Sequence, residues 1–313
     1  MGKIVRTISQ DGGILCMAID STDMAAQAER YHKTSAVMTA ALGRLLTAAS
    51  MMGDMLKGEK DSVTLRLAGD GSAGALIAVA DSKGNVKAYA ANAVVELPLN
   101  QYGKLDVSGA VGRQGTLTVI KDLGMREPYV GQIPIVSGEI AEDITHYYAV
   151  SEQTPTVCAL GVLVNTDLTV ISAGGYLIQL LPGVDDDTIT RLEENVNRMP
   201  PVSQMLADGM TPEQICEKAL EGFSPEVLDE STVCYRCDCS RERVERALCS
   251  LGSEELRQMA QEQEDTQVEC HFCDKRYHFS SKELLAMAKR REAVQRNSED
   301  EPSGGSCQNT DPQ

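Results

Sequence analysis

The chain has 313 residues, with 46 Asp and Glu against 29 Lys and Arg, and a formal net charge of -17. Such an excess of negative charge argues against a nucleic-acid partner, whose phosphates would be repelled over most of the surface. No stretch approaches roughly 18 uninterrupted apolar residues, and the first residues do not resemble a secretion signal. We therefore expect a cytoplasmic protein with no membrane partner.

Residues 1–181 predict an N-terminal domain of the α+β class, an antiparallel sheet with packed helices. Alternating apolar and polar residues predict the strands, and the tight turns between them suit antiparallel pairing alone. Ser and Thr caps before Ala- and Leu-rich segments predict the helices. We expect strands near residues 4–8, 14–19, 63–67, 75–80, 86–90, 115–121, 130–136, 156–164 and 168–178, and helices near 22–30, 35–56 and 139–151.

One loop of this domain matches the spacing of a nucleotide-binding motif. Gly69-Asp70-Gly71-Ser72-Ala73-Gly74 has the form GxGxxG, but the residues that follow favour a strand. A phosphate would then meet no helix N-terminus, so we interpret the loop as a hairpin turn. The domain shows no catalytic constellation, and we do not expect an enzyme.

Residues 182–232 predict a helical linker. An acid-capped helix reaches about Arg198, a break follows at Pro200-Pro201, and short helices are expected near 202–207 and 212–220. Such short, charged helices have only marginal stability by themselves and need to pack against neighbouring elements. The segment is either an ordinary connector or a metastable part of the protein.

Residues 233–290 predict a small zinc-binding module. Cys237-x-Cys239 and Cys270-x-x-Cys273 are two close pairs, as a tetrahedral Zn²⁺ site requires. Cys234 precedes Cys237 by three residues and is a possible alternative ligand, so the ligand set stays open at this point.

Charge and composition around these cysteines suggest redox sensitivity. Five basic residues would offset the charge of the thiolates and keep them deprotonated, the form that oxidants attack. The module has few large apolar residues, so bound metal, with an apparent free energy of roughly 10–16 kcal/mol, would supply much of its stability. A purely structural zinc site remains the alternative. The basic residues are Arg236, Arg241, Arg243, Lys275 and Arg276.

The other cysteines have different surroundings. Cys16 and Cys158 lie in apolar segments, which favours buried and inert thiols. A short helix should begin at Ser281 or Lys282 and end near Arg291. Residues 291–313, which include Cys307, predict a disordered tail because they are rich in polar and small residues.

Several segments together resemble one known family. The C-terminal cysteine segments resemble the signature of the 33 kDa chaperonin (heat shock protein 33) family of redox-regulated holdases, and further segments resemble its N-terminal domain. The C-terminal segments are Cys237-Asp238-Cys239-Ser240-Arg241-Glu242-Arg243, Cys270-His271-Phe272-Cys273 and Tyr277-His278-Phe279; the N-terminal ones are Ala41-Leu42-Gly43-Arg44, Gly103-Lys104-Leu105-Asp106-Val107, Ser151-Glu152-Gln153-Thr154-Pro155 and Ala173-Gly174-Gly175-Tyr176.

This resemblance implies an ATP-independent chaperone that holds unfolded or misfolded client proteins during stress. It implies that Cys237, Cys239, Cys270 and Cys273 bind one Zn²⁺ per chain in the reduced, inactive state. On oxidation Cys237 would pair with Cys239 and Cys270 with Cys273, zinc would be released, and the chain would form a homodimer. The linker would then loosen and expose apolar residues to clients, namely Ile189, Leu192, Val196, Leu206, Ile215 and Leu220.

Two other functions remain open. Cys270-x-x-Cys273 is also the motif of thiol-disulfide oxidoreductases, although no βαβ pattern surrounds it here. The second alternative is a module in which the zinc is purely structural and the zinc ribbon serves protein interactions.

Overall fold

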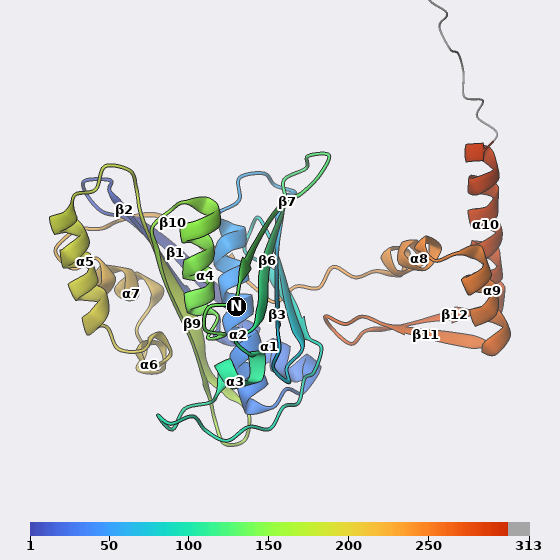
Figure 1. Cartoon of the computed structure of the whole chain (residues 1–313), viewed down its shortest axis with the longest axis horizontal. Helices are drawn as coiled ribbons and strands as arrows, with labels where there is room; N and C mark the ends of the chain where they lie inside the picture. Colours follow the sequence, from blue (N-terminus) through green and yellow to red (C-terminus); the bar gives the residue numbers. More distant parts are fainter. Residues whose placement is uncertain (300–313) are drawn as a thin grey trace, which may run out of the picture. The chain divides into compact units, whose positions relative to one another are not determined.

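The computed structural model describes residues 1–299, with side chains through Glu292. The chain divides into two compact units, one of residues Met1–Cys237 and a second that begins at Asp238. Figure 1 labels the elements of both units. The combination of antiparallel sheets and helices confirms the predicted α+β class.

The first unit contains two five-stranded antiparallel sheets, where one sheet was expected. The first has the strand order β10-β1-β2-β9-β8, and the second has the order β5-β4-β3-β6-β7. The strands are β1 (Gly2–Ile8), β2 (Ile14–Asp20), β3 (Ser62–Gly69), β4 (Ala75–Asp81), β5 (Val86–Ala90), β6 (Gly115–Asp122), β7 (Tyr129–Pro134), β8 (Thr156–Val164), β9 (Val170–Leu180) and β10 (Glu226–Val233).

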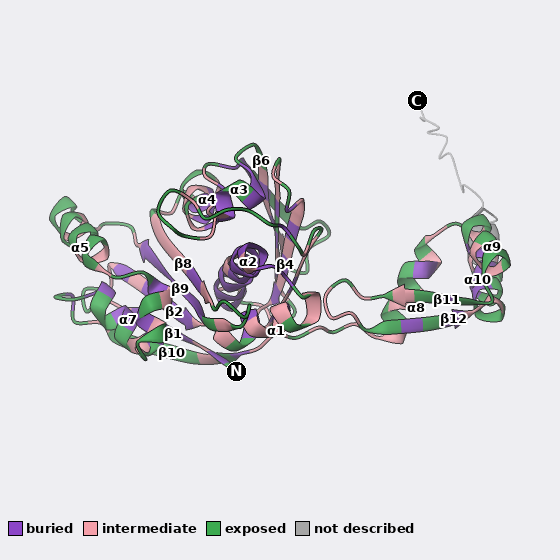
Figure 2. Ribbon diagram, turned by 90° about the horizontal axis from the view of Figure 1, so that it is seen from below, coloured by how far each residue is buried: buried purple, intermediate pink, exposed green. Residues whose placement is uncertain are grey.

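Helix α2 (Ala36–Asp54) forms the core between the two sheets, as Figure 2 shows. It is long and apolar enough to cross a membrane, but 89% of the apolar window is buried inside the protein, as in a core helix. Its two glycines allow a strand of each sheet to approach the helix closely. A Cβ atom at Gly43 would lie 2.8 Å from Val162 of β8, and one at Gly53 would lie 2.5 Å from the carbonyl oxygen of Asp81 in β4.

Smaller helices complete this core. They are α1 (Thr22–His32), α3 (Val107–Val111) and α4 (Ala141–Tyr147). The helix predicted at 139–151 is α-helical only as far as Tyr147. It then changes to the π-helical turn η1 (Tyr148–Glu152).

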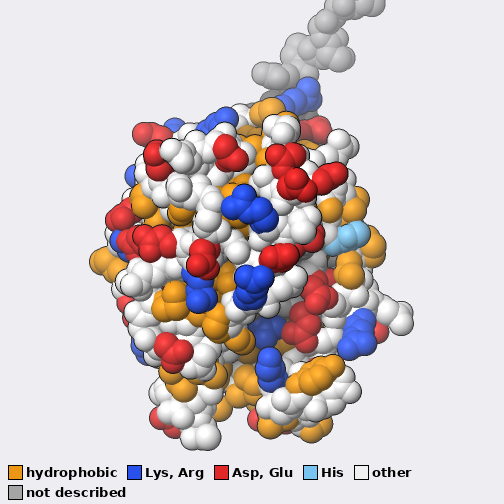
Figure 3. Space-filling model, turned by 90° about the vertical axis from the view of Figure 1, so that its left-hand side faces the viewer, with side chains coloured by type: hydrophobic (Ala, Val, Ile, Leu, Met, Phe, Trp, Pro, Cys, Tyr) orange, Lys and Arg blue, Asp and Glu red, His pale blue; other side chains and the backbone are white. Residues whose placement is uncertain are grey.

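The predicted linker helices form a layer on the opposite face of the first sheet. They are α5 (Asp186–Arg198), α6 (Val202–Ala207) and α7 (Pro212–Ala219). Leu192, Met205 and Ile215 are buried against the side chains of β2 and β9. In Figure 3 this side of the molecule shows apolar side chains scattered among charged ones. The layer is held to the first sheet by this apolar cluster, which the helices share with β2 and β9.

The last part of the predicted linker is not helical. Strand β10 pairs with β1 at the edge of the first sheet. Residues 234–236 then line the edge of the second sheet: Val86 N donates to Cys234 O at 3.1 Å, and Arg236 N donates to Val86 O at 2.8 Å. Tyr235 adds a hydrogen bond from its hydroxyl to Ala88 O, 2.8 Å long. We call residues 226–236 the edge strap, because they cover one edge of each sheet.

The second unit is built from a hairpin and three helices: α8 (Arg241–Ser250), α9 (Ser253–Glu262), β11 (Asp265–Glu269), β12 (Arg276–Ser280) and α10 (Ser281–Glu299). Helix α10 continues to Glu299, so residues 291–299 are not the disordered segment expected. The residues after Arg291 are mostly good helix formers, which explains the longer helix. Cys307 and the rest of the predicted tail lie outside the described residues.

One buried carboxyl group makes the first unit sensitive to pH. The Asp54 side chain is 4% exposed, and Arg6 Nη2 lies 3.7 Å from its Oδ2. Burial raises the pKa of this carboxyl above its ordinary value of 3.8. The folded state therefore binds more protons than the unfolded state, and Asp54 costs stability as the pH rises from the ordinary pKa through the raised one.

We expect Asp54→Asn to raise the melting temperature of the first unit at pH 7 in scanning calorimetry. The gain should disappear near pH 3, roughly where the wild-type carboxyl is protonated in both states. Asp229→Asn is the matched control, because Asp229 is the exposed partner of the same arginine, 2.8 Å from Arg6 Nη2. Equal gains in both variants would indicate an effect of net charge and contradict the assignment to Asp54.

Candidate metal centre

Four cysteines lie together where the second unit begins. The sulfur atoms of Cys237, Cys239, Cys270 and Cys273 all lie within 4.8 Å of one another. Zn–S bonds of 2.3 Å in a tetrahedron place the sulfurs about 3.8 Å apart. The donors therefore have the number, softness and spacing that a Zn²⁺ site needs, although the spacing does not identify the metal.

The first pair lies between the edge strap and helix α8. Cys237 follows the strap directly, and Cys239 is followed by the N-cap of α8. Ser240 caps this helix, because its side chain accepts a hydrogen bond from Arg243 N at 3.2 Å. Strap and helix cap thus fix the chain on either side of the pair.

The second pair occupies the turn of the β11–β12 hairpin. Cys270 N donates to Lys275 O at 3.0 Å, and Cys273 N donates to Cys270 O at 3.2 Å. Asp274 completes the turn with a φ of +54°, in the left-handed region. This tight turn directs both sulfurs to the same side of the hairpin.

The apolar cluster of the module extends to the sulfurs. Leu256, Phe279 and Leu284 are fully buried, and Cys239 and Cys270 pack against this cluster. Tyr277 donates a hydrogen bond from its hydroxyl to Cys239 Sγ, 3.1 Å away. That hydrogen bond, together with burial, raises the pKa of the Tyr277 hydroxyl. Sequence reasoning used Tyr277 only as part of a motif and missed this contact, which the pairing of Val268 with Tyr277 makes possible.

Four of the five basic residues around the cysteines, Arg241, Arg243, Lys275 and Arg276, have carboxylate or aromatic partners. The guanidinium of Arg241 stacks 4.4 Å from the ring centre of Phe279, and Lys275 Nζ lies 5.7 Å from that of Tyr277. At least part of their role is therefore to join the elements of the module, beyond the expected balancing of thiolate charge. The ion pairs are Arg241 with Glu283 and Glu245, Arg243 with Asp238, and Arg276 with Glu269.

Cys234 is not brought into the cluster. Its thiol donates to Asn85 Oδ1 at 3.2 Å, and its backbone N–H reaches the same oxygen at 3.3 Å. Both groups thus take part in the contact between the edge strap and the turn before β5.

The thiols expected to be inert lie in the first unit. Cys16 is fully buried, and its pKa is raised by its interaction with Cys216 and by burial. Cys158 is only partly covered, yet burial raises the pKa of its thiol to about 12.

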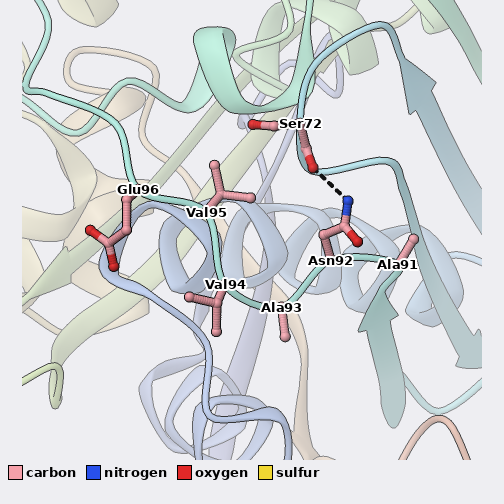
Figure 4. Close-up of a pocket in the computed structure, with 7 residues that line it drawn as sticks. All are labelled: Ser72, Ala91, Asn92, Ala93, Val94, Val95 and Glu96. Carbon is pink, nitrogen blue, oxygen red and sulfur yellow. Dashed lines mark hydrogen bonds between the residues drawn. The ribbon is translucent and has the colours of Figure 1, made fainter.

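The glycine-rich loop behaves as a hairpin turn. It joins β3 to β4, so no helix N-terminus follows it. Figure 4 shows the adjoining pocket of about 440 Å³, where Asn92 Nδ2 donates to Ser72 O at 2.7 Å. The only charged side chain that lines this pocket is Glu96, which would repel a phosphate.

Comparison with known proteins identifies the family. The family described as Hsp33 protein matches residues 2–280. The 33 kDa chaperonin of Acetivibrio thermocellus is 50% identical over 91% of this chain and 96% of its own, and that of Bacillus subtilis is 45% identical over 91% and 97%. The crystal structure of the 33 kDa chaperonin of Thermotoga maritima matches with a TM-score of 0.86 and 35% identity, over 93% of this chain and 99% of the other. The chain therefore belongs to the Hsp33 protein family, the family of the 33 kDa chaperonins, and its function is that of a chaperone.

Proposed function

We propose that this chain is a redox-regulated, ATP-independent holdase of the cytoplasm that is inactive when reduced and zinc-bound. The observation that carries the proposal is the cluster of four sulfurs in a chain of this family. Cys237, Cys239, Cys270 and Cys273 would hold one Zn²⁺, which acts as a cross-link between the two ends of the module when bound. With so small an apolar cluster, the module depends on that cross-link.

Oxidation of the sulfurs would remove the ligands. Each cysteine pair gives two electrons to one hydrogen peroxide, which takes up two protons from solvent and leaves as two waters, and a disulfide forms in place of two thiolates. The family resemblance favours the pairs Cys237–Cys239 and Cys270–Cys273. Geometry alone does not select them, because Cys239 Sγ and Cys273 Sγ lie only 3.4 Å apart.

The edge strap would carry the change toward the linker. Cys237 follows Arg236 directly, so a ligand of the cluster and the last residue held against β5 are neighbours in the chain. Loss of ligation would free the chain that follows Arg236 and leave the strap held only by its pairing with β1 and its contacts with β5. The linker helices precede the strap and are short, so they would loosen with it.

The linker layer offers the surface for clients. Leu192, Ile215 and Leu220 are at most 3% exposed in the docked state. Each fully buried side chain of this size contributes roughly 1.5–3 kcal/mol to docking. The same residues, once exposed, would bind apolar segments of unfolding proteins, and two such chains would associate as the oxidised homodimer.

An oxidoreductase is the less favoured alternative. Reactive Cys-x-x-Cys motifs lower the pKa of one thiol at a helix N-terminus, whereas Cys270 and Cys273 lie in a hairpin turn. A purely structural zinc ribbon differs from the proposed switch in one respect, since its metal should survive oxidation.

Two cysteine variants test the ligand set. We expect Cys237→Ser to weaken zinc binding strongly, since it removes one sulfur of the cluster. Cys234→Ser should retain one zinc per chain, because that thiol contacts Asn85. Zinc content is measured by elemental analysis after dialysis against a weak chelator. Comparable zinc loss in both variants would overturn the assignment.

Hydrogen exchange tests the linker. In the reduced, zinc-bound protein we expect slow exchange in α5 and α7, whose buried residues hold them to the sheet. After peroxide treatment at moderate heat, exchange there should approach that of an unfolded chain, while α2 stays protected. Unchanged protection of α5 and α7 after oxidation would contradict the proposed release.

Light scattering tests the function itself. A thermally unfolding protein is mixed with this chain in reduced or oxidised form, while a chromogenic chelator counts released zinc. Only the oxidised form should suppress aggregation, and suppression should rise with zinc release. Equal suppression by the reduced, zinc-loaded form would refute redox control, and turnover in an insulin reduction assay would favour the oxidoreductase instead.

A further inference from the structure

A second pair of thiols lies between the linker layer and the sheet beneath it. Cys16 is on β2 and Cys216 is on α7, and both are 0% exposed. Helix α7 packs directly on β2, and both side chains belong to the one apolar cluster between them. The Cys216 thiol also donates a long contact of 3.9 Å to Val5 O in β1.

The position of this pair is unlike that of the metal centre. Both thiols belong to the apolar cluster that Ile14, Ile178 and Ile215 form between the sheet and α7. They lie on the two sides of the surface that must separate if the linker helices leave the sheet, Cys16 on β2 and Cys216 on α7. A covalent bond between them would fasten α7 to β2.

We propose that Cys16 and Cys216 form a second redox site, whose disulfide locks the linker layer in its docked position. The proposal rests on the linker release described under the proposed function. The two oxidations would have opposite effects. Oxidation of the four-cysteine cluster releases the linker layer, and later oxidation of Cys16 and Cys216 fastens it to the sheet again.

The chemistry requires the linker to open before the bond forms. In the docked state both thiols are 0% exposed and therefore shielded from oxidants, and the interaction with Cys216 together with burial raises the pKa of the Cys16 thiol, which keeps it protonated and unreactive. Once α7 leaves the sheet, the thiolate of either residue attacks hydrogen peroxide, forms a sulfenic acid and releases water or hydroxide. On re-docking the other thiol attacks this sulfenic acid, the disulfide forms, and the sulfenic oxygen leaves as a second water.

The lock would act on chains that open without meeting a client. A bound client keeps α7 away from β2, so the two sulfurs cannot meet. In a chain without a client, α7 docks on β2 again and the disulfide forms. Only a reductant that breaks this disulfide makes the chain able to bind clients again.

Disulfide mapping on the full chain tests the site. The zinc-loaded protein is heated with peroxide, cooled, blocked with N-ethylmaleimide and digested with trypsin without reduction. Cleavage after Arg6, Arg30, Arg198 and Lys218 gives peptides 7–30 and 199–218, which each contain one cysteine, Cys16 or Cys216. We expect these two peptides to be linked after the heating and cooling cycle, and unlinked in protein kept cold with the same peroxide. Complete alkylation of both cysteines after the cycle, or their linkage to other cysteines, would overturn the proposal.

A functional comparison separates this lock from the holdase activity. After the same cycle, wild-type protein should suppress aggregation several-fold less than before cooling, whereas Cys216→Ala and Cys16→Ala should keep their activity. Cys158→Ala is the matched control, a cysteine of β8 outside this pair, and should behave as wild type. Equal loss in all four proteins would refute the lock. Absence of aggregation suppression in every form would refute the proposed function, while the peptide map would still decide whether the disulfide forms.

Discussion

The gathering of four sulfurs within 4.8 Å is the constraint on which the second unit depends. Its elements come from distant parts of the module, and its apolar cluster is small. A hairpin turn presents one pair, and the start of a helix holds the other. Unligated thiolates so close together would repel one another, so the arrangement is stable only with a cation or with protons among them. The fold of the module and the state of its sulfurs are therefore coupled.

Under the proposed function, the edge strap is the segment through which this coupling would reach the first unit. Residues 226–233 continue the first sheet, and residues 234–236 contact the second. Hydrogen bonds donated by Tyr235 to Ala88 O and by Cys234 to Asn85 Oδ1 fix the strap immediately before Cys237. Lys3 of β1 adds ion pairs to Glu230 of the strap and Glu213 of α7, and its hydrogen bond lowers the pKa of Glu213 to about 2. Strap, sheet and linker layer are thus held by one set of contacts.

Much of the first unit was predictable because its residues alternate between buried and exposed positions. Strand β4, for example, alternates strictly, as expected for a strand with one covered face. Strand β10 was missed because it lies at an edge and nearly all its side chains are exposed, which removes the apolar signal. The division into two sheets also escaped prediction, since alternation shows that a face is covered but not which element covers it.

The candidate site was predictable to a similar degree. Cysteine spacing indicated the cluster, because close pairs constrain where sulfurs can lie. Spacing could not exclude Cys234, and the contact with Asn85 that draws it to the strap joins residues far apart in the sequence. The meeting of Cys16 with Cys216 has the same origin. Neither residue stands in a recognisable motif, and only the docking of α7 on β2 brings them together.

The close packing at the two glycines of α2 limits deformation of the sandwich. Because Gly43 and Gly53 let the helix touch a sheet on either side, the sandwich has no room to shear or swell. Under the proposed function, movement would therefore occur outside the sandwich, in the linker layer and the zinc module. The sandwich would then remain as the folded surface on which those segments dock again, without refolding of the whole polypeptide.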